Sequence, residues 1–193
     1  MDKDARKKTR QLYWAMGITL FGLGGLGIGL MYAFVPEGRK ALSGLGFAEW
    51  YKAIVAGTLF AALSLPFLVG LLETPFLQPT RRFFAALMAD YRVRWWQIWL
   101  LSACAGIGEE ILFRGALQPL LGLPLTALLF VFLHGYLNPL NRPLFLYGIL
   151  LCLVSAGFGY LFVVFSLPAA MIAHFWIDVV LLYYLRRHRP QAE

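Results

Sequence analysis

Six ionisable side chains lie within or at the ends of long apolar runs of this sequence. A charged side chain at the centre of a bilayer costs roughly 2.5–3.5 kcal/mol even on the lenient insertion scale. Several such charges, if unpaired, would cost about as much as the roughly 5–15 kcal/mol that keeps a whole domain folded. We therefore expect them to be paired, to line a wet cavity, or both, because a structural ion pair explains two of them but not six. The six are Glu109, Glu110, Arg114, His134, His174 and Asp178.

Helical spacing separates the two adjacent carboxylates. Glu110 and Arg114 are four residues apart and share one face of a helix, in the favourable order of Glu before Arg. Glu109 lies about 140° around the helix from Arg114, so it does not share that partner. Its carboxylate is free to face another helix, and partial loss of water makes such a group a better proton acceptor.

The turn expected near Gly122 brings Glu109 and His134 to one depth. Glu109 precedes this turn by 13 residues and His134 follows it by 12, so both lie roughly 18–20 Å from it along their helices. A carboxylate and an imidazole at matched depth can hold one water between them. His174 and Asp178 are four apart and share a face, but His174 is expected higher in the membrane unless its helix is tilted or kinked.

The composition predicts an integral membrane protein. The chain has 193 residues, of which 60% are hydrophobic and 14% charged, against about 45–50% and 25% in soluble domains. Two cysteines exclude a disulfide-stapled scaffold, and a net charge of +7 on so apolar a chain favours a membrane over nucleic acid. We predict an all-α, polytopic membrane helical bundle of about six transmembrane helices. The expected spans are Leu12–Phe34, Ala53–Leu72, Trp95–Leu121, Leu123–His134, Leu144–Phe165 and Pro168–Tyr184.

The basic residues predict the orientation of the bundle. Of the 17 Lys and Arg residues, only Arg39, Lys40 and Lys52 fall in outer loops when the N-terminus is inside, and most of the others, Arg189 among them, fall in inner segments. Both termini are therefore expected in the cytoplasm, with the protein in the inner (plasma) membrane and the cavity opening to the cytoplasm. We expect a retained N-terminal anchor rather than a cleaved signal peptide.

Three further features complete this organisation. The tryptophans at 95, 96 and 99 are typical of an interfacial belt, and the apolar residues of 83–91 predict a short amphipathic helix on the inner leaflet. The Gly25–Gly29 pair predicts close internal packing of the first span. We expect the chain to divide into an N-terminal region (1–94) with two spans and the interfacial helix, a four-helix core (95–185) that holds all six ionisable residues, and a basic tail (186–193).

Three short motifs resemble those of the CPBP or Abi family, which includes CAAX prenyl proteases of the Rce1 type and bacteriocin-processing proteins. Residues Glu109–Gly115 resemble the EExxxR motif, Phe130–His134 the FxxxH motif, and His174–Asp178 the HxxxN motif. Each motif is weak alone, but the three occur in the right order on separate apolar helices. The resemblance covers about Trp95–Tyr184.

The resemblance implies an intramembrane glutamic endopeptidase that needs no metal or other cofactor. In such a protein Glu109 and His134 activate water, while His174 and the residue at 178 stabilise the oxyanion. Glu110 and Arg114 then support the helix of the first motif. The implied partners are membrane lipids and a membrane-associated peptide or protein, with or without a lipid anchor, and no nucleic acid.

One motif position departs from the family pattern. Asp178 stands where the motif has Asn, and an ionised carboxylate accepts hydrogen bonds but does not donate them. Either Asp178 stays protonated, or it orients His174 and leaves that imidazole to donate alone. We favour the orienting role.

Two other functions fit the same residues. A metal-dependent version of the protease would bind zinc through Glu109, His134 and His174. A non-catalytic transporter or partner-binding protein would use the ionisable cavity to relay protons, although the two halves of the chain show no inverted repeat.

Overall fold

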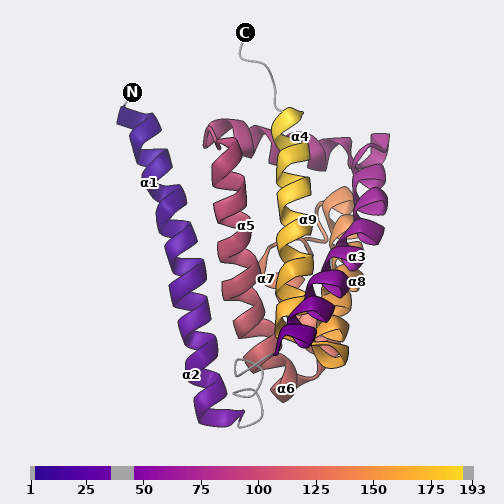
Figure 1. Ribbon diagram of the computed structural model, residues 1–193. Helices are drawn as coiled ribbons and strands as arrows, with labels where there is room; N and C mark the ends of the chain where they lie inside the picture. Colours follow the sequence, from indigo (N-terminus) through magenta and orange to yellow (C-terminus); the bar gives the residue numbers. More distant parts are fainter. Residues whose placement is uncertain (1–2, 36–45, 189–193) are drawn as a thin grey trace.

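Every element of the described chain is a helix. The structure is a computed structural model that describes residues 3–35 and 46–188, and its helices form one upright bundle (Figure 1). This confirms the all-α prediction. Three of the basic residues that were counted to predict the orientation lie outside the described residues, namely Arg39, Lys40 and Arg189.

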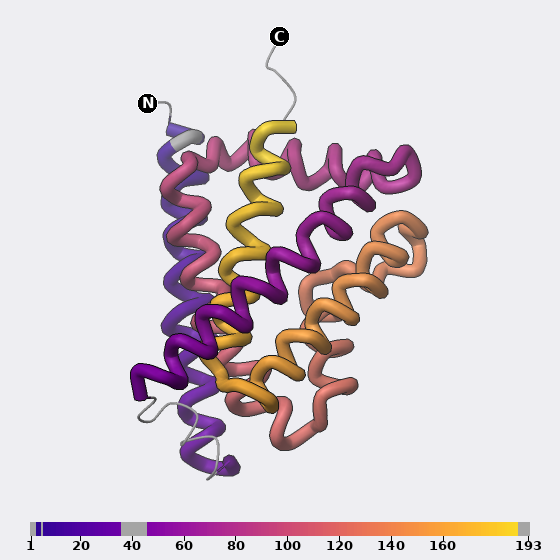
Figure 2. Tube along the Cα trace, turned by 45° about the vertical axis from the view of Figure 1, so that its right-hand side comes forward, coloured from indigo at the N-terminus to yellow at the C-terminus, as the bar shows by residue number. Residues whose placement is uncertain are grey.

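The first span is one continuous helix on the edge of the bundle. It runs through α1 (Lys3–Gly17), the π-helical segment η1 (Ile18–Leu23) and α2 (Gly24–Phe34). The next helix, α3 (Phe47–Leu72), crosses the bundle obliquely, as Figure 2 shows.

The helix with the first motif and the helix with the second form an antiparallel pair. The first is continuous through α5 (Trp95–Glu110), the π-helical η4 (Ile111–Leu117) and α6 (Gln118–Leu121). Gly122 then turns the chain with φ of 78°, a left-handed conformation that only glycine adopts without strain. The helix α7 (Leu123–Leu133) returns from this turn, so the turn predicted at Gly122 is confirmed.

The last two helices complete the bundle, with α9 at its centre. The helix α8 (Arg142–Val164) and the helix α9 (Leu167–Arg187) follow the loop after α7. In Figure 1 α9 stands between α5 and α3, and in Figure 2 α3 crosses in front of it. The helix α9 packs against α3, α5 and α8. The first residues of the expected basic tail, Arg186 and Arg187, are still part of α9.

Four helices of the described chain are long and apolar enough to cross a membrane: Arg6–Phe34, Phe47–Leu72, Arg142–Val164 and Leu167–Arg187. They correspond to four of the six expected spans. The run from Trp95 to Leu121 is helical but carries three charged side chains. The helix α7 has 11 residues and reaches about 16 Å, half the roughly 30 Å of a bilayer core. It ends in the middle of the bundle because His134 and Gly135 terminate it there.

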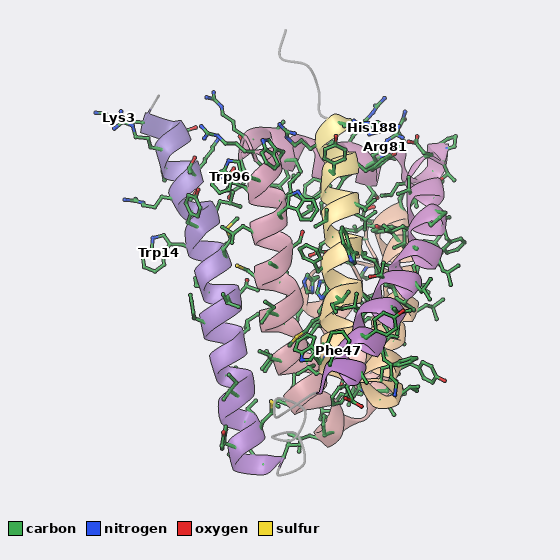
Figure 3. All side chains as sticks on the ribbon, viewed as in Figure 1. Lys3, Trp14, Phe47, Arg81, Trp96 and His188 are labelled. Atoms are coloured by element: carbon green, nitrogen blue, oxygen red, sulfur yellow. The ribbon has the colours of Figure 1, made fainter. Side chains whose placement is uncertain are left out.

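The two ends of the described chain lie at the same end of the bundle. Lys3, Arg81, Trp96 and His188 all occur there, whereas Trp14 points outward from the first span (Figure 3). The predicted amphipathic helix is confirmed as α4 (Gln78–Asp90), which lies across this end (Figure 1). A short 3₁₀ turn, η3 (Pro75–Leu77), leads into it from α3.

An exposed polar cluster ties α3, α4 and α9 together at this end. Arg81 of α4 pairs with Glu73 just after α3, and the hydroxyl of Tyr184 on α9 donates to Glu73. The Tyr184 hydrogen bond and the Arg81 guanidinium lower the pKa of the Glu73 carboxyl below its usual value. The cluster thus links the end of α3 with α4 and α9.

Glycines bring the first span into close contact with the helix of the first motif. Gly24 and Gly27 are buried, and a Cβ at Gly27 would lie 2.8 Å from the backbone of Leu112 in η4. Gly25 and Gly29 are exposed, and a Cβ at either would meet no atom within 4 Å. The first span does pack closely through glycines, as predicted, but the glycines in contact are Gly24 and Gly27. Gly25 and Gly29 lie on a different, exposed face of the same helix.

We expect Gly27→Ala to lower the stability of the detergent-solubilised protein by about 1–3 kcal/mol, because the added methyl forces α2 away from η4. Gly25→Ala is the matched control two residues away. It adds the same methyl where there is room, and alanine favours a helix over glycine, so stability should stay equal or rise. Thermal unfolding of both variants checks this. Equal losses in the two variants would contradict the close contact of α2 with η4.

Candidate active site

The two carboxylates of the first motif lie where α5 becomes a π-helix. Glu109 and Glu110 end α5, and Arg114 lies within η4. Short π-helical segments inside α-helices occur frequently at functional sites. The Nε atom of Arg114 lies 3.1 Å from Oε2 of Glu110, and both side chains are buried. The pair predicted from the spacing of four is therefore present.

The guanidinium of Arg114 is held by contacts that the spacing does not reveal. Its Nη2 donates to the backbone oxygen and to Oγ of Ser155 in α8, both at 2.9 Å. The rings of Phe130 and Phe158 lie 4.8 and 5.6 Å from the guanidinium carbon. A buried cation needs such partners because leaving it uncompensated is costly. Arg114 thus connects η4 with α7 and α8.

The imidazole of His134 faces the carboxylate of Glu109. Its Nδ1 lies 2.7 Å from the backbone oxygen of Phe130, so Nδ1 carries the proton, and its Nε2 lies 3.4 Å from Oε2 of Glu109. The matched depth of the two side chains is confirmed. However, 3.4 Å is too short for a water on the line between these atoms. A water that donates to both atoms would have to lie beside this line.

The imidazole of His174 links the two glutamates. Its Nδ1 lies 2.8 Å from Oε1 of Glu110, and this is a buried hydrogen bond. Its Nε2 lies 3.5 Å from Oδ2 of Asp178 and 4.0 Å from Oε2 of Glu109. His174 therefore lies at the depth of Glu109 and not higher, because α9 passes through the centre of the bundle beside α5. The contact with Glu110 is shorter than the contact with Asp178, so Glu110 is the main partner that orients the His174 ring.

Aromatic rings hold the His174 imidazole in place. Phe158 of α8 stacks on it with centroids 5.2 Å apart and an interplanar angle of 14°. Phe130 of α7 meets it edge to face at 5.7 Å and 78°. The Phe of the second motif thus contacts both histidines and Arg114, whereas nothing in the spacing of the charged residues indicates Phe158.

Glu109, His134, His174 and Asp178 line one cavity of about 280 Å³. The spacing of the charged residues does not indicate three further polar side chains in its wall, which are Tyr136, Tyr147 and Ser155. Tyr147 and Ser155 are polar residues eight apart in an apolar helix, so they share a face, and this signal could have identified them. The rest of the wall is largely apolar.

The charges of this cluster are unbalanced. Glu109, Glu110 and Asp178 contribute three carboxylates, against the single guanidinium of Arg114. In the described part of the chain, no group of three or more His, Cys, Asp and Glu side chains could hold a metal ion. The zinc alternative thus gains no support from the geometry.

A model of the family described as Rce1-like, type II CAAX prenyl endopeptidase, matches residues 91–180. Residues 91–180, which carry the three motifs, belong to this family. The match begins just before α5 and ends within α9, so all six predicted site residues fall inside it. No curated protein and no solved structure matches the chain significantly.

The Rce1-like match over residues 91–180 indicates the general class of this protein. The chain is a CAAX protease-like enzyme of the multi-pass membrane type, and the family implies a membrane-associated peptide or protein as substrate. The four apolar helices long enough to span a bilayer agree with this class.

Proposed function

We propose that this chain is an intramembrane glutamic endopeptidase in which Glu109 and His134 activate a water. The observation that carries the proposal is the 3.4 Å approach of Glu109 Oε2 to His134 Nε2 at the wall of the cavity. Both atoms are acceptors when Nδ1 of His134 carries the proton, so a water donating to both is the natural third partner. The lone pairs of that water then face the cavity.

The reaction follows from the protons that these groups hold. Glu109 removes a proton as the water oxygen attacks the peptide carbonyl, which is general-base catalysis. The resulting oxyanion accepts a hydrogen bond from Nε2–H of a protonated His174. The proton on Glu109 passes to the leaving amine as the carbon–nitrogen bond breaks. The products are a carboxylic acid, which keeps the second proton of the water, and an amine, and Glu109 is again ionised, so atoms and charge balance.

Glu110 and Arg114 act as positioning residues in this proposal. The Glu110 carboxylate accepts from Nδ1 of His174 and so keeps the other nitrogen directed at the cavity. Arg114 holds Glu110 in turn. Such a preorganised arrangement needs no reorganisation when charge develops in the transition state. Asp178 lies on the cavity side of His174, where its Oδ2 is 3.5 Å from Nε2 and helps to orient that nitrogen.

The membrane arrangement belongs to the same proposal. We propose that residues 95–185 form the catalytic core and that residues 1–94 flank it. The termini and α4 would face the cytoplasm, in the plasma membrane. The position of Arg81, Trp96 and the chain ends at one end of the bundle supports this (Figure 3), since basic loops and interfacial tryptophans are typical of the cytoplasmic side.

A comparison of membrane peptides tests the function. Wild type and Glu109→Gln, expressed at equal abundance in the native host, should differ in peptide ends found by mass spectrometry. An end present only with wild type would identify both a substrate and its cleaved bond. Identical peptides in the two strains would contradict proteolysis and favour the transporter or partner-binding function. Stoichiometric zinc in the active protein, with loss of activity on chelation, would overturn the metal-free mechanism.

A further inference from the structure

The proposed reaction lacks one hydrogen-bond donor for the oxyanion. His174 supplies one donor, but Asp178, at the position of the motif's Asn, has no hydrogen to donate when it is ionised. Enzymes that form a tetrahedral intermediate commonly direct more than one donor at it. A second donor should therefore be sought in the wall of the same cavity.

The hydroxyl of Tyr147 is an unused donor in this wall. Tyr147 lies in the first part of α8, is buried with only 4% of its surface exposed, and lines the cavity. Within residues 3–35 and 46–188 its hydroxyl has no hydrogen-bond partner. Buried tyrosine hydroxyls usually find one. Ser155, on the same face of α8, is held at the Arg114 guanidinium through its Oγ, whereas the Tyr147 hydroxyl has no such partner.

The ring of Tyr147 packs beside the site. It meets the ring of Tyr136 edge to face, with centroids 6.1 Å apart. Tyr136 in turn stacks on His134, with an interplanar angle of 16°. The neighbouring Gly148 allows α8 to approach this loop, because a Cβ there would lie 2.8 Å from the backbone oxygen of Tyr136.

We propose that the Tyr147 hydroxyl donates a hydrogen bond to the oxyanion, in place of the amide expected at position 178. This inference rests on the proposed endopeptidase function. The hydroxyl keeps its proton throughout, and only the strength of its hydrogen bond changes as the carbonyl oxygen gains charge. Tyr136 has a different role, because its ring stacks on His134 and its side chain is only partly buried.

Tyr147→Phe tests this proposal because it removes only the hydroxyl. The probe is a synthetic peptide spanning the bond identified in the membrane comparison, in vesicles of phosphatidylethanolamine and phosphatidylglycerol. We expect kcat to fall about 10²-fold, as for the loss of one oxyanion donor, with KM changed by less than about threefold. Tyr160→Phe, also on α8 but 61% exposed, should keep the wild-type kcat.

Combining Tyr147→Phe with Asp178→Asn separates donation to the oxyanion from a structural role of Tyr147. In Asp178→Asn the new amide can donate to the oxyanion, so adding Tyr147→Phe should lower kcat by less than about tenfold. Asp178→Asn alone should retain substantial activity. A structural role for Tyr147 would give the same loss in both backgrounds.

Three results would overturn the inference. Wild-type kcat in Tyr147→Phe, or equal losses in the wild-type and Asp178→Asn backgrounds, would overturn the role of Tyr147 while the endopeptidase function stands. A wild-type protein that cleaves no membrane peptide would overturn the endopeptidase function, and this inference with it.

Discussion

Glu109→Gln and His134→Ala are each expected to lower kcat by roughly 10³-fold or more, and the double variant should be no worse than the poorer single one. The reason is the 3.4 Å contact between the two side chains. If both act on one water, removing either group leaves that water without its second partner, and little remains for the other change to remove. Single-turnover assays with purified protein in vesicles measure the three rates.

The fold of these variants must be intact for this comparison to be meaningful. Glu109→Gln preserves the shape of the side chain, and His134 lies at the end of α7 with its side chain 35% exposed, so neither change should unfold the protein. Phe132→Leu, two residues before His134 and 61% exposed on the outside of α7, is the matched control and should keep the wild-type rate. Losses that multiply in the double variant would show that the two residues act on separate steps.

Arg114→Met is expected to cause the largest loss of stability, about 3–5 kcal/mol, because it leaves the buried Glu110 carboxylate without its cation. The Arg114 side chain is 1% exposed and that of Glu110 is fully buried. The change also removes both hydrogen bonds to Ser155. Thermal unfolding in detergent and the yield of folded protein measure the loss.

A second substitution distinguishes an uncompensated charge from lost packing. Adding Glu110→Gln to Arg114→Met removes the stranded carboxylate, so part of the stability should return, although His174 then loses the charged partner of its Nδ1. Arg82→Met, on the exposed face of α4, should change stability by less than about 0.5 kcal/mol. If Arg114→Met were as stable as wild type, the buried ion pair would have no structural role.

The helices and the local pairs of the site are determined by the sequence itself. The apolar runs are long because only a helix satisfies its own backbone within a bilayer. The contact of Glu110 with Arg114 depends only on a spacing of four within one helix. The approach of Glu109 to His134 needs only the turn at Gly122, since equal distances along two antiparallel helices give equal depth.

The tertiary structure decided which faces of the helices meet. The spacing assigned Glu110 to Arg114 alone, but α9 passes beside α5 and brings His174 into hydrogen-bond distance of Glu110. Likewise Gly24 and Gly27, rather than Gly25 and Gly29, face η4. Spacing within a helix defines which residues share a face, but the crossing angles and the rotation of each helix depend on how all the side chains pack together. Contacts between distant segments therefore emerge only when the whole bundle is assembled.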